Sequence, residues 1–478
     1  MTPRLRPTLL AALAIATSFV AARADAIPAF ARKYGTSCLT CHTVYPKLGP
    51  FGEAFRRNGY RFPGIDSDQV KAETIPLGQD ATKKTFPASV WPAVIPASVP
   101  IAIGANGRAV VIPSSTSTAG RGARPGTVVS LQDLVAEGQL WAGAAVDDSI
   151  TLWGEISFAG SAEVEHAQIL FGDLLGPRHA VNLVVGRGFP NVTPFGPHSS
   201  YLADVMLPNA PVGALLGNGS AWQLVDNYDG VELNGVLAGR FDYALGVNAG
   251  ATGGELRAPT EDVYGRVGVK VGGMRQDGEG ANAPRDALHP WAETALHLYA
   301  FGYRTNTFLD PATAPPGAAP NDVGTALGIG ARLQLASLEL DLGWYRDRHG
   351  HGTDAGTPAT ARVGFGELSY VVFPWLVPAL RVENLALDVA GAPGASAWHV
   401  MPGVACLIRP NIKLVVAANW EHADGFPSSA AAPGTLFPWS GGSGDVGAFT
   451  IAPGPGATSP RATSSELETI AFFVAWAI

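Results

Sequence analysis

The chain has 478 residues, of which 47% are hydrophobic and 15% are charged, and its formal net charge is −8. An acidic balance argues against nucleic acids and anionic lipid surfaces as partners. The 58 glycines and 38 prolines lie mostly within alternating apolar segments. This pattern favours many short strands over a disordered chain.

Residues 1–26 have the features of an export signal. Arg4 and Arg6 form a basic start, the short apolar run Leu9–Ala22 follows, and Ala24-Asp25-Ala26 offers a cleavage site. The apolar run is shorter than the stretch of about 20 residues that a membrane-spanning helix needs. We therefore expect a signal peptide at 1–26, removed before Ile27, and export to the periplasm or beyond.

The next motif is Cys38-Leu39-Thr40-Cys41-His42, a CxxCH sequence. This spacing is typical of c-type haem attachment, in which both thiols form thioethers and the histidine ligates the iron. A structural zinc site would need two further ligands at similar spacing, but the only other cysteine is Cys406 and the nearest other histidine is His166. A thioredoxin-like motif would require a βαβ context, which is absent. We expect one covalent haem c on Cys38 and Cys41, with His42 as an axial ligand.

The segment around this motif is small. Glu53–Tyr60 is predicted to be a short helix closed by Gly59, a residue suited to the left-handed C-terminal position. Domains below about 40 residues rarely fold without a cross-link, metal or partner, so we expect this segment to lean on the rest of the chain. Residues 65–95 read as an extended linker, giving a haem segment with its linker at 27–95. The apolar residues available to cover a haem face are Phe30, Tyr45, Leu48, Phe51, Phe55 and Tyr60.

The second axial ligand is not evident from the sequence. Between Ile27 and Asp204 there is no methionine, and the only histidines are His42, His166 and His179. The distal position could be open, filled by a lysine or terminal amine, or supplied from the C-terminal region. The candidates in predicted strands of that region are the pair His399 and Met401, which share one strand face, and His297.

From residue 96 onward, apolar residues alternate with polar or small ones. Ile470, Phe472, Val474 and Trp476, for example, are set against the small or polar Thr469, Ala471, Ala475 and Ala477. This period of two predicts strands with one apolar face. Sixteen such segments begin near residues 97, 128, 149, 163, 180, 228, 241, 261, 291, 323, 338, 362, 376, 396, 412 and 466.

The connections between these segments alternate between short and long. Short turns include Gly239-Arg240, Ala336-Ser337 and Arg409–Asn411, whereas residues 189–227 and 422–465 are long connections. Gly160–Ala162 and Gly272–Pro290 break this rhythm. An even-stranded outer-membrane barrel has short periplasmic turns and long outer loops; a soluble β-sandwich is the alternative. We expect an all-β, 16-stranded transmembrane outer-membrane β-barrel at 96–478, preceded by a small α-helical monohaem cytochrome c segment.

One predicted outer loop carries a possible metal-binding sequence. His349, His351 and Asp354 follow Asp347 closely, and imidazole with carboxylate suits Fe(II) and other transition metals. A charged, solvated loop explains the same residues.

Residues 30–60, which include Phe30, Cys38, Cys41-His42, Phe51-Gly52 and Gly59-Tyr60, resemble the N-terminal segment of the fused monohaem cytochrome c–porin family of outer-membrane iron oxidases. The resemblance is specific over about 35 residues and extends to the rest of the chain only as architecture. It implies electron transfer from extracellular Fe(II), or another reduced donor, through one haem in or near the barrel lumen to a periplasmic cytochrome or other electron carrier. The chain would then be an iron(II) oxidase surrounded by outer-membrane lipid, with the haem segment periplasmic or inside the barrel.

Two other functions fit the same residues. One is a diffusion porin whose haem-bearing segment is a plug or a redox sensor. The other is an open-site haem enzyme such as a peroxidase, which would leave the distal position to small ligands.

Overall fold

The computed structural model describes residues 29–44, 47–62, 74–76, 84–88, 94–96, 100–112, 128–131, 137–145, 149–158, 161–192, 202, 224, 227–250, 262–280, 289–308, 321–351, 357–391, 394–424 and 465–477. The expected signal peptide lies outside these ranges. Among the described residues, no helix is long and apolar enough to cross a membrane.

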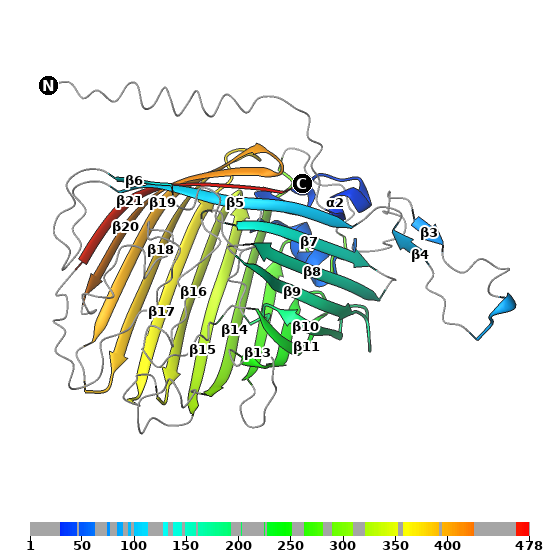
Figure 1. Cartoon of the computed structure of the whole chain (residues 1–478), viewed down its shortest axis with the longest axis horizontal. Helices are drawn as coiled ribbons and strands as arrows, with labels where there is room; N and C mark the ends of the chain where they lie inside the picture. Colours follow the sequence, from blue (N-terminus) through cyan, green and yellow to red (C-terminus); the bar gives the residue numbers. More distant parts are fainter. Residues whose placement is uncertain are drawn as a thin grey trace.

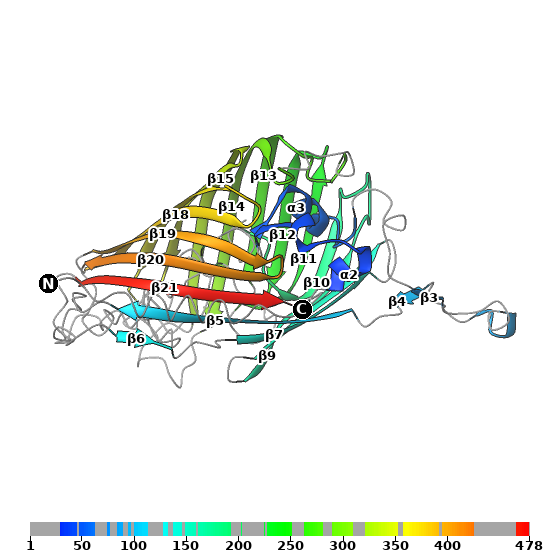
Figure 2. The same cartoon turned by 90° about the horizontal axis from the view of Figure 1, so that it is seen from above.

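A closed antiparallel barrel dominates the molecule (Figures 1 and 2). Its strands are β5 (Ile101–Ile112), β6 (Val128–Ser130), β7 (Glu137–Ala145), β8 (Ile150–Phe158), β9 (Ala162–Phe171), β10 (Asn182–Gly188), β11 (Tyr228–Leu237), β12 (Phe241–Asn248), β13 (Asp262–Gly272), β14 (Glu293–Phe308), β15 (Asn321–Ala336), β16 (Leu338–His349), β17 (Ala359–Tyr370), β18 (Leu376–Val389), β19 (Ala395–Arg409), β20 (Ile412–Asp424) and β21 (Ser465–Ala477).

The barrel has sixteen strand positions, as expected, because β6 and β7 are two parts of one interrupted strand. β6 pairs with residues 110–112 of β5, and β7 pairs with residues 101–106 of the same strand. β21 pairs with β5 from Ile470 opposite Val111 to Ala477 opposite Gly104, which closes the cylinder. Each predicted strand start lies within about four residues of an observed start. The alternative of a β-sandwich is excluded by the closed barrel.

The alternation along the strands separates an apolar outer surface from a polar lumen. On β13, Val263, Val267 and Val271 are 40%, 62% and 63% exposed, whereas Asp262 and Arg266 are at most 2% exposed. A β-strand sends successive side chains to opposite faces. The outward face is therefore the apolar one, as in barrels that span an outer membrane.

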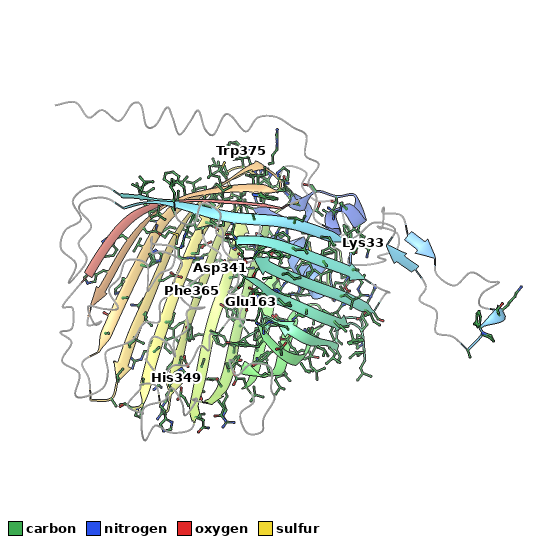
Figure 3. All side chains as sticks on the ribbon, in the orientation of Figure 1. Lys33, Glu163, Asp341, His349, Phe365 and Trp375 are labelled. Atoms are coloured by element: carbon green, nitrogen blue, oxygen red, sulfur yellow. The ribbon has the colours of Figure 1, made fainter. Side chains whose placement is uncertain are left out.

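Exposed aromatic residues mark both ends of this apolar surface. Phe373 and Trp375 stack with ring centroids 5.3 Å apart at the short turn between β17 and β18. Trp398 and Trp420 are 46% and 40% exposed near the opposite end. Figure 3 places Trp375 and His349 at opposite ends of the barrel. Aromatic belts of this kind are typical of the two membrane interfaces.

The N-terminal residues form a plug segment, defined here as residues 29–44 and 47–62. It contains α2 (Ala29–Tyr34), the 3-10 turn η1 (Cys38–Thr40), the short paired strands β1 (His42–Val44) and β2 (Lys47–Leu48), and α3 (Pro50–Arg57). The expected helix is present but begins earlier, at Pro50, because proline suits the first helical position. Gly59 has a φ of +69° just after the helix, as expected.

The plug segment lies inside the barrel near the end that carries the short turns (Figure 2). Val44 packs in one apolar cluster with Val371, Val377 and Ala405 of the barrel. The unusually long turn between β13 and β14 contributes Met274, which packs against the plug's own cluster of Tyr34, Phe51 and Phe55. This contact gives a structural reason for the length of the Gly272–Pro290 turn, which was an exception to the alternation of short and long connections.

The expected linker is only partly described. β3 (Thr74–Pro76) and β4 (Val94–Pro96) pair with each other as a separate two-stranded sheet. They precede β5 and take no part in the barrel.

Candidate functional site

The CxxCH motif forms a tight turn that brings its functional side chains to one cavity. The Ser37 hydroxyl accepts a hydrogen bond from the Leu39 amide at 3.3 Å, which caps η1. The Cys41 amide then donates to the Cys38 carbonyl at 3.2 Å. Cys38, Cys41 and His42 all line the same cavity.

Helix α3 holds this turn from behind. The Gly49 amide donates to the Cys41 carbonyl at 2.8 Å. A Cβ atom at Gly52 would lie 2.0 Å from the same carbonyl oxygen, so only glycine permits this close approach. The helix and the motif therefore form one compact unit.

The cavity has a volume of about 500 Å³ and lies between the plug segment and one side of the barrel. This volume is within the range of about 300–1,000 Å³ that small-molecule and cofactor sites occupy. The plug side is lined by Phe30, Leu48, Phe55 and Tyr60, and the barrel side by Trp141, Trp153 and Trp476. The site is therefore rich in aromatic side chains, as an apolar planar cofactor requires.

Three of these rings lie nearly parallel across the junction between plug and barrel. The ring centroids of Phe30 and Tyr60 are 5.2 Å apart, and those of Tyr60 and Trp153 are 5.3 Å apart. Stacked aromatic pairs contribute about 0.5–1.5 kcal/mol beyond the area that they bury. The stack thus attaches α2 and the end of α3 to β8.

Of the six apolar residues expected to cover a haem face, four line the cavity. Phe51 instead packs in the plug's own cluster. Tyr45 lies outside the described residues.

Burial keeps both motif thiols neutral. Burial raises the pKa of the Cys38 thiol, and burial together with the nearby Cys38 raises the pKa of Cys41 to about 12. Neither thiol is in a disulfide.

Charged residues anchor the other side of the plug segment. Lys47 is 1% exposed, its Nζ lies 3.0 Å from Asp341 Oδ2, and it also contacts Glu339. Arg57 lies 3.2 Å from Asp242 Oδ2. Both carboxylates on this wall are shared with barrel arginines, since Arg332 lies 2.7 Å from Asp341 and Arg266 lies 2.6 Å from Asp242.

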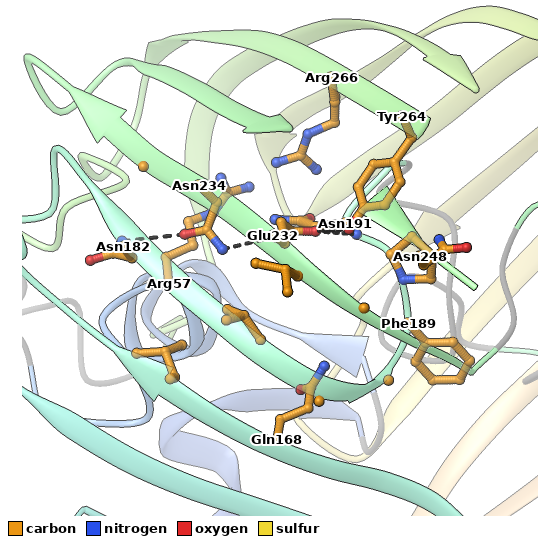
Figure 4. A pocket seen from close by; sticks show the side chains of 18 of the residues that line it. Arg57, Gln168, Asn182, Phe189, Asn191, Glu232, Asn234, Asn248, Tyr264 and Arg266 are labelled. Atoms are coloured by element: carbon orange, nitrogen blue, oxygen red, sulfur yellow. Dashed lines mark hydrogen bonds between the residues drawn. The ribbon is translucent and has the colours of Figure 1, made fainter. Parts of the chain in front are cut away.

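A second, smaller cavity of about 120 Å³ adjoins the first and shares Arg56, Tyr60, Gln168 and Phe189 with it. Figure 4 shows its polar lining around Glu232. This carboxylate accepts hydrogen bonds from Tyr264, Asn234 and the Asn191 amide at 2.7, 2.8 and 2.9 Å. The protein itself thus supplies three hydrogen-bond donors to the Glu232 carboxylate.

The three distal candidates lie away from the large cavity. His297 is 2.9 Å from Asp242 and belongs to the anchoring network. His399 is 3.0 Å from Glu383 and 3.3 Å from Asn419. Met401 is 1% exposed in the apolar cluster around Val44.

In its described residues, the sequence around His349 and His351 forms neither the metal site nor the solvated loop considered from the sequence. His349 is fully buried, with Asp322 at 2.5 Å and Asp347 at 3.0 Å from its two ring nitrogens. Asp354 lies outside the described residues. Within the described ranges, no group of three His, Cys, Asp or Glu side chains could hold a metal ion.

Sequence reasoning did not single out His166, Glu155 or Trp153 as site residues, yet all three line the cavity. The strand alternation predicts which residues face the lumen, but not which strands lie opposite the motif. Which strands face the motif is known only from the position of the plug segment in the structure.

No protein-family model matches the sequence, and no curated protein matches it either. An anion-selective porin from Comamonas acidovorans matches 80% of this chain and 99% of its own with a TM-score of 0.50 and 11% identity. OmpF of Salmonella typhi, in complex with daunomycin, matches 79% of this chain and 97% of its own with a TM-score of 0.47 and 10% identity. OmpT of Vibrio cholerae has the same two shares, a TM-score of 0.44 and 11% identity. The first similarity supports a porin-like barrel fold, and the other two scores are too low to add to it.

Proposed function

We propose that the chain is an outer-membrane c-type cytochrome–porin fusion, in the manner of the fused monohaem cytochrome–porin family. One haem c would be held by thioethers to Cys38 and Cys41, with His42 as an axial ligand. The observation that carries the proposal is the aromatic cavity of about 500 Å³ that the two thiols and His42 line together.

The residues present fit this cofactor. Haem has two apolar faces and two propionate groups, and the cavity is bordered both by aromatic rings and by the Arg56 guanidinium. Arg56 Nη2 bonds Glu53 at 3.4 Å, while its buried Nε has no hydrogen-bond partner among the described residues, so Arg56 suits a propionate. When bound, the haem would supply a one-electron redox centre.

The position of the plug segment suits electron transfer across the membrane. It lies near the short turns, which in outer-membrane barrels face the periplasm. A periplasmic cytochrome or other electron carrier would accept electrons at this end. The donor would be extracellular Fe(II), or another reduced species, entering from the loop end; each Fe(II) oxidised to Fe(III) would deliver one electron.

Covalent haem and its reduction test this proposal. Haem staining after denaturing electrophoresis of outer-membrane fractions is expected to give a band at the mass of the mature chain. Fe(II) added to intact cells should reduce that haem. A band that stains but stays oxidised under Fe(II) would overturn iron as the donor, and an unstained band would overturn the cytochrome itself.

A diffusion porin with a haem-bearing plug or redox-sensor segment is the second candidate. The similarity of the fold to an anion-selective porin favours it, and taken alone the fold comparison favours it over electron transfer. Such a protein would conduct ions in planar bilayers and show no turnover with external donors. The electron-transfer function instead predicts that external donors reduce the haem, so turnover with such donors separates the two candidates.

A further inference from the structure

We propose that His166 on β9 is the second axial ligand of the haem iron, on the face opposite His42. The inference rests on the proposed haem c. It makes the barrel itself part of the cofactor site, so that the iron joins the plug segment to the wall.

A β-bulge aims His166 into the cavity. Glu155 of β8 pairs with His166, but the next residue, Ile156, pairs with Val164, which leaves Glu165 as the extra residue. Consecutive strand residues normally point to opposite faces. Here both Glu165 and His166 line the cavity, while Val164 is 46% exposed on the outer face. Bulges re-aim side chains in this way and are frequent next to functional sites.

A hydrogen bond to Glu155 holds the His166 ring in place. Its Nδ1 lies 3.0 Å from Glu155 Oε2, and the other oxygen of Glu155 accepts from Gln139 Nε2 at 3.1 Å. Because a carboxylate only accepts, Nδ1 of the neutral ring carries the hydrogen and Nε2 carries the lone pair. Metal-bound histidines commonly donate their second ring N–H to a carboxylate in this manner.

Packing also restricts the ring. Phe189 meets it edge-on, with centroids 4.8 Å apart at 71°. The His166 side chain is only 12% exposed. It is therefore a largely buried imidazole that lines the cavity from the barrel, whereas His42 lines it from the plug segment.

No other described side chain of a suitable type competes for this role. Among the histidines and methionines of the described ranges, only His42 and His166 line the cavity. None of the lysines that the structure describes lines it either. His297, His399 and Met401 have the separate surroundings given above.

Two histidine ligands would close the iron to small molecules and set its redox properties. A filled distal position disfavours peroxide and CO chemistry, whereas an open one permits it. Since methionine ligation raises the reduction potential, a pair of histidines implies a lower potential than a His/Met site would have.

Spectroscopy of the purified full-length protein tests the assignment. The wild type is expected to be low-spin in both oxidation states and slow to bind CO. His166→Ala should keep wild-type amounts of thioether-bound haem but become high-spin and bind CO rapidly, and added imidazole should restore the low-spin spectrum. His399→Ala is the matched control, since His399 is also a buried wall histidine bonded to a glutamate, and it should remain low-spin.

The outcomes separate this inference from the proposed function. A His166→Ala protein with a wild-type low-spin spectrum, or a high-spin wild type, would overturn His166 as a ligand while leaving the cytochrome intact. A wild type without covalent haem would overturn both. Should His166→Ala fail to assemble, His166→Met retains a potential ligand and should introduce sulfur-to-iron charge transfer; an unchanged spectrum would count against the proposal.

Discussion

The two sides of the plug segment contact the barrel by different means. Toward β12–β16, Lys47, Arg57 and Glu53 form ion pairs with buried charged residues of the wall. Toward β5, β7–β9 and β21, aromatic, small and polar residues, among them Glu137, Glu155 and Glu165, surround a cavity. The ion pairs on the charged side fix the position of the plug segment. The cavity side therefore does not have to be close-packed and can leave room for a cofactor.

The largest expected effect comes from removing the two cysteines proposed to attach the haem, which lie on the cavity side. In the Cys38→Ala/Cys41→Ala double variant, haem staining on denaturing gels should be lost completely, because no thioether can form. Cys406→Ala is the control and should stain like the wild type. Staining that persists in the double variant would contradict covalent attachment at this motif.

Lys47→Met removes the ion pairs of Lys47 with Glu339 and Asp341 on the charged side of the plug segment. This change leaves Glu339 and Asp341 buried with Arg332 as a remaining charged partner. Loss of one partner of a buried ion pair costs about 3–5 kcal/mol, and Arg332 should keep the cost near the lower end of that range. The plug segment should become sensitive to protease, and the barrel should show a higher single-channel conductance. Arg362→Met removes a charge from a pair with 46% and 54% exposed side chains and should change neither measurement; unchanged protection in Lys47→Met would show that the ion pairs do not hold the plug.

A smaller effect is expected where the motif meets α3. Gly52→Ala would push a methyl group into the Cys41 carbonyl, and overpacking of this kind costs about 1–3 kcal/mol. The thermal unfolding midpoint should fall. Gly364→Ala is the matched control, because the nearest atom to its Cβ would be 3.7 Å away. Equal midpoints for the two variants would argue against the close packing of α3 on the motif.

The smallest effect should follow the loss of one ring from the stack between the two regions. Trp153→Leu removes the barrel's contribution to the stacking with Phe30 and Tyr60. Stacking contributes about 0.5–1.5 kcal/mol beyond buried area, so protease sensitivity of the plug should rise less than in Lys47→Met. Trp153→Phe keeps a ring, so its plug should be more sensitive to protease than that of the wild type and less sensitive than that of Trp153→Leu. A plug more protease-sensitive in Trp153→Leu than in Lys47→Met would reverse the ranking of the two sides.

The barrel could be predicted closely because alternation with a period of two is a local property of each strand. The interruption between β6 and β7 was missed, and it carries no comparable local pattern. The motif Cys38 to His42 is evident from spacing within five positions, and its two thiols and histidine line one cavity; haem attachment there stays a prediction. The barrel residues that line the rest of the cavity could not be predicted. Their position depends on how the plug segment docks and on the bulge at Glu165, which shifts the register between β8 and β9.

The seam of the barrel has a consequence for biogenesis. Ala102 and Ala105 of the first strand and Ala475 and Trp476 of the last strand all border the cavity, so the chamber exists only once the two ends of the sheet have joined. On the proposed function, an enzyme would have to reach Cys38 and Cys41 to attach the haem, and closure places both thiols on the wall of this chamber. Maturation is therefore expected to be ordered, with porphyrin loading of the periplasmic chain before insertion; pulse-labelled, uninserted chains should already stain for haem.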